Sequence, residues 1–245
     1  MIRFLDFFKS SVLKSFLNLI YPPLCLHCRN VLAENAPIFC ANCLSELELI
    51  NPQERCPFCF SSDYTKGYPC CSTCYHKKPF LNRIASSFDY FGPASTLVRQ
   101  MKYGQKPYLA KGAGAFLAAQ FLQLGWPQPD CIVPVPIPFT RWIERGYNQS
   151  QLLAKTLSQI LSCPMQDILT RGSGVPSQAG LNLEQRQLLQ ANVFQLKKKH
   201  MLHDKCVLIV DDVLTTGSTL KRCAEAISED CPKSIYGLTL CGAIK

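Results

Sequence analysis

The sequence lacks any apolar run near the length of about 20 residues that a membrane-spanning helix needs, so no such helix is predicted. Acidic residues are also scarce: 17 Asp and Glu stand against 26 Lys and Arg, a formal charge of +9 over 245 residues. This surplus is compatible with a partner that carries phosphate groups. A hydrophobic content of 47% excludes a largely disordered chain.

A recognisable secretion signal is lacking as well. Asp6, Lys9 and Lys14 interrupt the apolar residues near the N-terminus, and no small-residue cleavage site follows. The apolar side chains recur every four residues, which predicts an amphipathic helix over residues 1–21. We expect this helix to pack on the protein's own core; a helix lying on a membrane surface is the alternative. Without a secretion signal, a cytoplasmic protein with reduced thiols is expected.

Cysteine, by contrast, is abundant. Nine of the 15 cysteines lie between residues 25 and 74, and the other six are scattered singly over the rest of the chain. The chain is too long for a small protein held together by disulfides. The distribution therefore predicts a small cysteine-built module at residues 22–80, followed by an ordinary domain at residues 82–245.

Eight of the cysteines form four Cys-x-x-Cys pairs. A shift of 31 residues carries the first two pairs onto the last two, so the unit is duplicated. Two such pairs fold four thiolates toward one point and complete a closed, structural Zn²⁺ site. A double zinc ribbon with two zinc ions is predicted, although buried thiols, four disulfides, or pairing across the halves remain alternatives. The predicted ligands are Cys25, Cys28, Cys40, Cys43, Cys56, Cys59, Cys71 and Cys74.

Beyond residue 80, apolar segments typical of buried strands alternate with helical patterns. Such alternation predicts a parallel α/β sheet, whose ligands bind at the carboxyl ends of the strands. The predicted strands are residues 84–90, 131–135, 206–210 and 235–241, and the predicted helices are residues 95–101, 108–124, 149–161 and 219–230.

The most informative motif follows the strand at residues 206–210. That apolar segment leads directly into Asp211 and Asp212 and then into a Thr- and Ser-rich loop that opens a helix. Clustered backbone N–H groups, hydroxyls and a helix N-terminus suit a phosphate monoester. Adjacent carboxylates suit the vicinal hydroxyls of ribose, with Mg²⁺ nearby. A ribose 5-phosphate site is predicted, and a capped tight turn is the simpler alternative.

This string resembles the 5-phosphoribosyl pyrophosphate signature of the type I phosphoribosyltransferases. With Val133-Pro-Val-Pro136 and Arg145-Gly-Tyr-Asn-Gln149, the chain is similar to the ComF family of competence-associated proteins, which join a cysteine-rich zinc module to such a domain. The resemblance spans nearly the whole chain and departs from the family at residues 171–177. It implies a parallel sheet with helices on both faces, and a role in handling single-stranded DNA with the DNA-uptake machinery during natural transformation.

The resemblance also implies residue roles. Asp211 and Asp212 are expected to bind the ribose hydroxyls. The loop after residues 131–135 is expected to meet the pyrophosphate, whose displacement needs charge stabilisation more than a protein nucleophile. No catalytic residue is assigned. The 5-phosphate contacts are Thr215, Thr216, Gly217, Ser218 and Thr219, and the candidate pyrophosphate cations are Arg141, Arg145, Lys102 and Arg186.

Several features leave two interpretations open. Arg141 and Arg145 could belong to a solvated turn before a helix that Asn148 caps. The Gly- and Ser-rich loop at residues 171–190 is either a mobile cover over the site or a surface excursion. The domain is either an active transferase or a binding module that holds a nucleotide or single-stranded DNA in the same pocket. The Lys-rich run at residues 197–200 and the aromatics near the cysteine pairs could contact DNA, or be a solvated turn and a small core.

Overall fold

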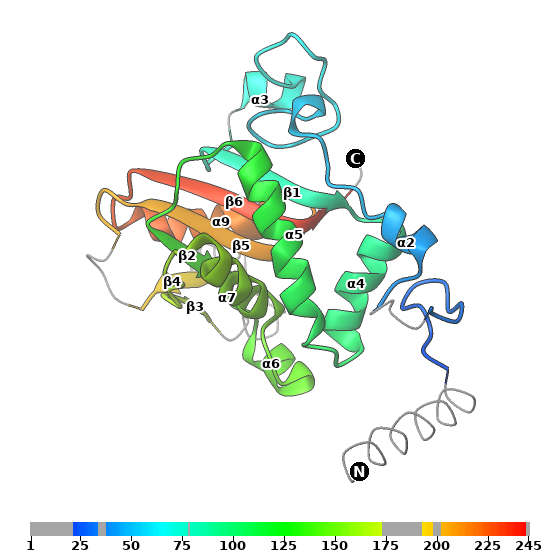
Figure 1. The fold of residues 1–245 in the computed structure, drawn as a ribbon. Helices are drawn as coiled ribbons and strands as arrows, with labels where there is room; N and C mark the ends of the chain where they lie inside the picture. Colours follow the sequence, from blue (N-terminus) through cyan, green and yellow to red (C-terminus); the bar gives the residue numbers. More distant parts are fainter. Residues whose placement is uncertain (1–21, 34–37, 78, 173–192, 198–201, 244–245) are drawn as a thin grey trace, which may run out of the picture.

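The computed structural model describes residues 22–33, 38–77, 79–172, 193–197 and 202–243 (Figure 1). The predicted N-terminal helix at residues 1–21, Arg186 and residues 198–201 of the basic run lie outside the described residues. Most of the predicted loop at residues 171–190 lies outside them too. Within the described part of the chain, every helix is too short or too polar to cross a membrane.

Four parallel strands form the central sheet in the order β1-β6-β5-β2. Residues 206–210 are all buried, as expected for strands of a parallel sheet that is covered on both faces. The structure confirms the predicted α/β fold and the four predicted strands, but β5 continues past Val210 and includes both carboxylates of the motif. The strand bounds are Arg83–Asp89 for β1, Cys131–Pro134 for β2, Cys206–Leu214 for β5 and Ser234–Gly242 for β6.

Helices cover both faces of this sheet (Figure 1). Three of them, α4 (Gly92–Tyr103), α5 (Leu109–Leu124) and α7 (Gln149–Leu161), pack on one face, and α9 (Ser218–Ser228) packs on the other. A close approach joins α5 to α7, because a Cβ added at Gly114 would lie 2.5 Å from the Cβ of Thr156. Each face of the sheet therefore has its own hydrophobic core.

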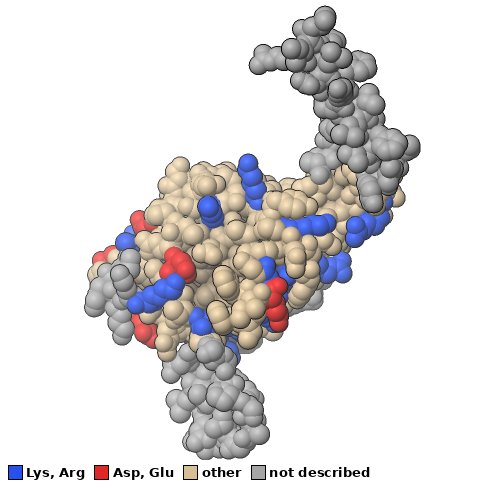
Figure 2. All heavy atoms as spheres, turned by 90° about the horizontal axis from the view of Figure 1, so that it is seen from below, with Lys and Arg blue, Asp and Glu red and all other residues tan. Residues whose placement is uncertain are grey.

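In the sheet domain, two short features are not among the predicted elements. The antiparallel strands β3 (Leu169–Arg171) and β4 (Phe194–Leu196) pack beside α9. The helix α6 (Phe139–Arg145) follows β2, and none of its seven residues is buried. It protrudes at the lower side of the molecule in Figure 1, so the view from below in Figure 2 faces it. Elements this short carry too few apolar positions for a periodic signal.

The two cysteine segments contact the sheet domain at different places. The first packs on α4, and its helix is α2 (Ala41–Ser45). The second carries α3 (Ser72–His76) and follows a short 3-10 turn at Pro52–Glu54. It attaches to the outer edge of β1, where the Ile84 N–H donates to the Phe58 carbonyl at 2.8 Å. The two cysteine segments are therefore anchored on different elements of the sheet domain.

Candidate functional site

The cysteines gather into two groups of four. Cys25, Cys28, Cys40 and Cys43 form the first group, and Cys56, Cys59, Cys71 and Cys74 form the second; in each, all four Sγ atoms lie within 4.8 Å of one another. The pairing is therefore within each half of the duplication. The Cys28–Cys40 and Cys59–Cys71 Sγ distances are both 3.6 Å. Tetrahedral coordination at about 2.3 Å places sulfurs about 3.8 Å apart, so the geometry fits a metal ion.

The protonation chemistry of these groups also fits a bound cation. Burial opposes ionisation of Cys25, but backbone N–H groups, that of Cys40 first among them, outweigh burial and lower its pKa to about 6. Cys56 behaves in the same way, with a pKa of about 7. Burial and neighbouring thiols instead raise the pKa of Cys43 and of Cys74. Four thiolates so close together require a positive charge between them.

Disulfides do not form, since all 15 cysteines are free thiols. The disulfide alternative is therefore wrong for this structure. Cys70 lies outside the second group and packs against it, partly buried. His27 lies outside the first group, and its Nδ1 is hydrogen-bonded to the Thr96 hydroxyl at 2.8 Å.

A cavity of about 560 Å³ opens at the carboxyl ends of β2 and β5. Its volume lies within the range of small-molecule sites. Tyr90 and Arg171 line it as well, and neither was among the predicted site residues. Arg171 follows the apolar pair Ile168 and Leu169 after one intervening residue, and a pair so short gives no strand signal from which its position could have been predicted. The predicted residues that the cavity brings together are Lys102, Arg141, Arg145, Asp211, Asp212, Thr215 and Thr219.

The two carboxylates occupy consecutive positions of β5 and have different partners. The Asp211 Oδ1 accepts from the Ser150 hydroxyl at 2.8 Å and from the Asp212 N–H at 2.9 Å. Asp212 forms a 2.8 Å ion pair with Lys102, in the last turn of α4. Burial, and then the charge of Asp212, raise the pKa of Asp211 to about 7. A nearby cation or a hydroxyl donor would therefore stabilise the ionised form of Asp211.

Asn148 positions the start of α7, and with it Ser150, next to the Asp211 carboxylate. Its side chain accepts from the Ser150 N–H at 3.0 Å, which caps α7 as predicted. Its amide also donates to the Val135 carbonyl at 2.9 Å, just beyond β2. The cap therefore fixes the start of α7 beside the ends of β2 and β5.

The loop after β5 has the backbone conformation that its glycine allows. Gly217 precedes α9 with φ +74°, a left-handed conformation that side chains disfavour. The Ser218 N–H approaches the Thr216 hydroxyl at 3.4 Å, and Thr215, Thr216 and Ser218 are exposed. Only Thr215 and Thr219 of this loop line the main cavity, whereas Thr216 and Gly217 border a second one.

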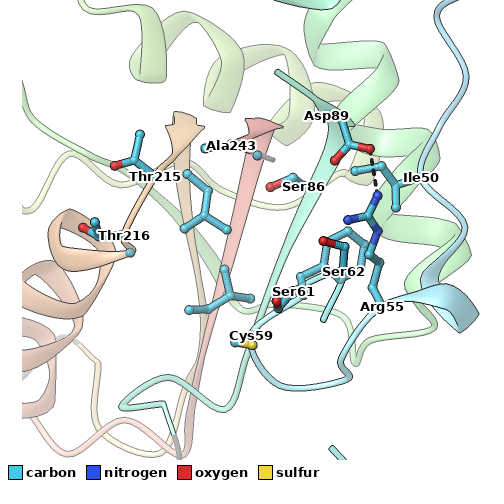
Figure 3. Close-up of a pocket in the computed structure, with 15 residues that line it drawn as sticks. Ile50, Arg55, Cys59, Ser61, Ser62, Ser86, Asp89, Thr215, Thr216 and Ala243 are labelled. Carbon is cyan, nitrogen blue, oxygen red and sulfur yellow. Dashed lines mark hydrogen bonds and ion pairs between the residues drawn. The ribbon is translucent and has the colours of Figure 1, made fainter. Parts of the chain in front are cut away.

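This second, smaller cavity of about 80 Å³ lies between the loop and the second cysteine group (Figure 3). Ser61 and Ser62, which follow Cys59, lie on one side of it, and Thr215 and Thr216 lie on the other. Thr215 borders both cavities. The second cysteine segment is therefore a neighbour of the predicted phosphate loop.

The cations of the main cavity come from three elements. Arg141 and Arg145 lie on α6, so the turn expected as an alternative is a helix. Arg145 donates to the Gln149 side chain at 3.0 Å, and its Nε is buried with no hydrogen-bond partner among the described residues. On β3, burial and then the charge of Arg141 hold the pKa of Arg171 below its usual range. Clustered cations of this kind are stabilised when an anion binds between them.

Comparisons with known proteins identify related sequences. The phosphoribosyl transferase domain family matches residues 148–244. The DNA utilization protein YhgH of Salmonella typhi is 32% identical over 231 residues, covering 91% of this chain and 98% of that protein. Competence protein F of Haemophilus influenzae is 28% identical over 213 residues, covering 83% and 90%.

Among solved structures, a purine phosphoribosyltransferase from Pyrococcus horikoshii aligns at 23% identity and a TM-score of 0.33, covering 56% of this chain and 73% of that chain. The sequence similarity to YhgH extends over nearly the full length of both proteins and includes the cysteine segments. The chain belongs to the YhgH/ComF family, with two four-cysteine clusters and a phosphoribosyltransferase domain.

Proposed function

We propose that the main cavity binds 5-phosphoribosyl pyrophosphate, or a closely related sugar phosphate, together with Mg²⁺. The observation that carries this proposal is the convergence of three complementary features in one cavity: the carboxylates of Asp211 and Asp212, the Thr- and Ser-rich loop before α9, and a set of cations. Each matches one part of such a ligand, namely the ribose hydroxyls, the 5-phosphate and the pyrophosphate.

The chemistry of each contact follows from its geometry. Asp211 and Asp212 accept hydrogen bonds from ribose hydroxyls, and Mg²⁺ takes carboxylate and phosphate oxygens as ligands. The N–H groups and hydroxyls at the start of α9 bind the phosphate monoester. Arg141, Arg145 and Arg171 neutralise the charge that builds up on pyrophosphate as it leaves. When Asp212 binds a ligand, the Lys102 ammonium ion beside it is also available to a phosphate.

Calorimetry with phosphoribosyl pyrophosphate and Mg²⁺ tests the binding proposal. Asp211→Asn/Asp212→Asn keeps the size of both side chains and removes their charge, so the heat of binding should disappear. Asp204→Asn is a matched control, because its side chain is 82% exposed and pairs only with His203 among the ion pairs of the described residues. Equal affinities for the wild type and the double variant would falsify the proposal.

In a cell, we propose that this site serves DNA utilization or uptake, as the names of the YhgH and Competence protein F relatives suggest. The domain is then either a transferase that releases pyrophosphate, or a binding module that holds a nucleotide or a DNA end. The second possibility is favoured by α6, on which Phe139 and Trp142 are exposed and Arg141 and Arg145 line the cavity. Release of pyrophosphate in a screen of nucleobases and amines would identify the domain as a transferase. No release in any assay would favour the binding module.

Zinc is the metal that we propose for the two cysteine groups. Four thiolates without an open position are the donor set of a structural Zn²⁺ site, and each group provides them at suitable distances. Elemental analysis of the purified protein should find about two zinc ions per chain. A protein that is folded and contains neither zinc nor another thiophilic metal contradicts this assignment.

A further inference from the structure

The helix α6 has an unusual distribution of side chains. Phe139, Trp142 and Ile143 are spaced three and four residues apart, so they share one face, and they are 65%, 50% and 63% exposed. Arg141 and Arg145 lie four residues apart and line the main cavity. The helix therefore turns its cations toward the cavity and its apolar side chains toward solvent, the reverse of a helix that packs on its own core.

The exposed face is largely aromatic and has an ordered geometry. The rings of Phe139 and Trp142 are nearly parallel, at an interplanar angle of 9° and a centroid distance of 6.2 Å. On the cavity side of α6, the Arg145 guanidinium lies 5.1 Å from the ring centre of Tyr103, which is 71% exposed. An exposed apolar face of this kind marks an interaction site, and planar rings next to arginines suit unpaired bases and their phosphates.

The position of the basic side chains favours a nucleic acid over a membrane as the partner of this face. In the view of this side of the molecule, Lys and Arg side chains are more widespread than Asp and Glu (Figure 2). On α6 itself, Glu144 is the one acidic residue beside two arginines. A helix that lies on a membrane points its cations outward beside its apolar face. Here the arginines point instead into a cavity with the features of a phosphate site, so a nucleic acid strand fits both surfaces at once.

We infer that the outer face of α6 is a stacking platform for single-stranded DNA. Bases stack on Phe139 and Trp142, and the connecting phosphates contact Arg141 and Arg145 on the way to the cavity. The inference rests on the DNA role in the proposed function and extends it by assigning a contact surface. It does not require that the cavity binds phosphoribosyl pyrophosphate.

Tryptophan fluorescence gives a direct measurement, since the chain has two tryptophans. Trp126 is buried between Phe121 and Tyr236, whereas Trp142 is half-exposed on α6. Titration of the full chain with an oligothymidylate of about 15 nucleotides at low salt should quench the Trp142 emission. The affinity should fall steeply as salt is added, because phosphate contacts release counterions.

Variants separate stacking from other causes of binding. Phe139→Ala/Trp142→Ala should weaken oligothymidylate binding, measured by anisotropy of a labelled strand, by about tenfold or more. Trp142→Phe retains a ring and should keep most of the affinity. Leu122→Ala is the matched control, since this residue of α5 is 69% exposed and carries no ring. Both alanine variants should fold, because the replaced side chains are exposed.

Three results would overturn the inference. The first is that Phe139→Ala/Trp142→Ala binds the oligonucleotide as tightly as the wild type. The second is loss of binding to anionic vesicles with unchanged DNA binding, which would assign the face to a membrane. The third is a wild-type dimer that becomes a monomer in the double variant with unchanged DNA binding.

The heat of phosphoribosyl pyrophosphate binding, measured by calorimetry, should be the same in Phe139→Ala/Trp142→Ala as in the wild type. If the wild type itself shows no heat, the sugar-phosphate proposal fails while the DNA result still stands.

Discussion

The two cysteine groups share one spacing but lie in different surroundings. Cys25 is fully buried and, with Cys43, belongs to the large core that also contains Leu97 and Val98 of α4. The second group has a small cluster of its own, formed by its cysteines with Phe58 and partly buried neighbours. Identical ligand spacing therefore gives the same thiolate arrangement twice, while the residues around each group decide what that arrangement stabilises.

Each cysteine segment also supports a different part of the site. The first packs on α4, whose last turn carries the Lys102 that pairs with Asp212. The second is joined to the end of β1 by the ion pair of Arg55 with Asp89, at 2.7 Å. This ion pair lies beside the cavity between the second cysteine segment and the predicted phosphate loop (Figure 3). A metal in either group can therefore affect the proposed sugar-phosphate site, by different routes.

The largest effect should come from removing equivalent ligands. Cys25→Ser and Cys56→Ser change positions related by the duplication, and each should cost one metal equivalent by elemental analysis. Because Cys25 belongs to the main core, Cys25→Ser should lower the melting temperature by roughly 10 °C. Cys56→Ser should instead lose hydrogen-exchange protection within its own segment, since its cluster is small and separate.

Cys70→Ser is the control for this pair, because Cys70 lies outside both groups and should leave both metals bound. Comparable loss of protection in both segments after the Cys56→Ser change alone would show that the two groups are not independent.

The next largest effect is a pH dependence of stability that arises in the sheet domain and involves neither cysteine segment. The pKa of Asp211 is raised from 3.8 to about 7, so the folded protein binds the extra proton between those values. The stability that protonated Asp211 gives to the folded protein is therefore fully present below about pH 4, and it is lost as the pH rises toward 7. Asp211→Asn removes this loss, and at pH 8 it should be more stable than the wild type by about 2 kcal/mol.

Denaturant titrations of the two proteins at pH 5 and pH 8 measure this difference. Changes in metal binding affect the wild type and the variant alike, so their difference isolates Asp211. A constant difference at both pH values contradicts the raised pKa. The gain in stability should accompany the loss of ligand binding, because the same desolvated carboxyl group serves the site.

The smallest effects should come from breaking the single contacts that attach each cysteine segment to the sheet domain. Arg55→Ala leaves the Asp89 carboxylate partly buried without its partner, and should cost about 1–2 kcal/mol of unfolding free energy. His27→Ala removes one hydrogen bond to Thr96 of α4 and should cost about 0.5–1 kcal/mol. Chemical denaturation measures both. A larger cost for His27→Ala would reverse the order that the structure indicates.

Local patterns predicted much of this molecule correctly. Four strands, the helices at residues 108–124 and 149–161, and the cap at Asn148 follow from apolar periodicity and capping preferences. The helix predicted at residues 95–101 exists but begins earlier, at Gly92. Patterns could not show that β5 continues to Leu214, because its carboxylates look like the start of a loop when their partners Ser150 and Lys102 are not known.

The sequence by itself determined the four-cysteine groups, the parallel sheet and the string of carboxylates and hydroxyls that begins in β5, because each depends on spacing along a short segment. Only the tertiary structure decided that Lys102 pairs with Asp212, that Arg171 enters the cavity, and that α6 turns its rings outward. These contacts join residues from different elements, and their positions depend on how helices pack across the whole sheet. Spacing fixes what one segment can bind, whereas packing fixes which segments meet.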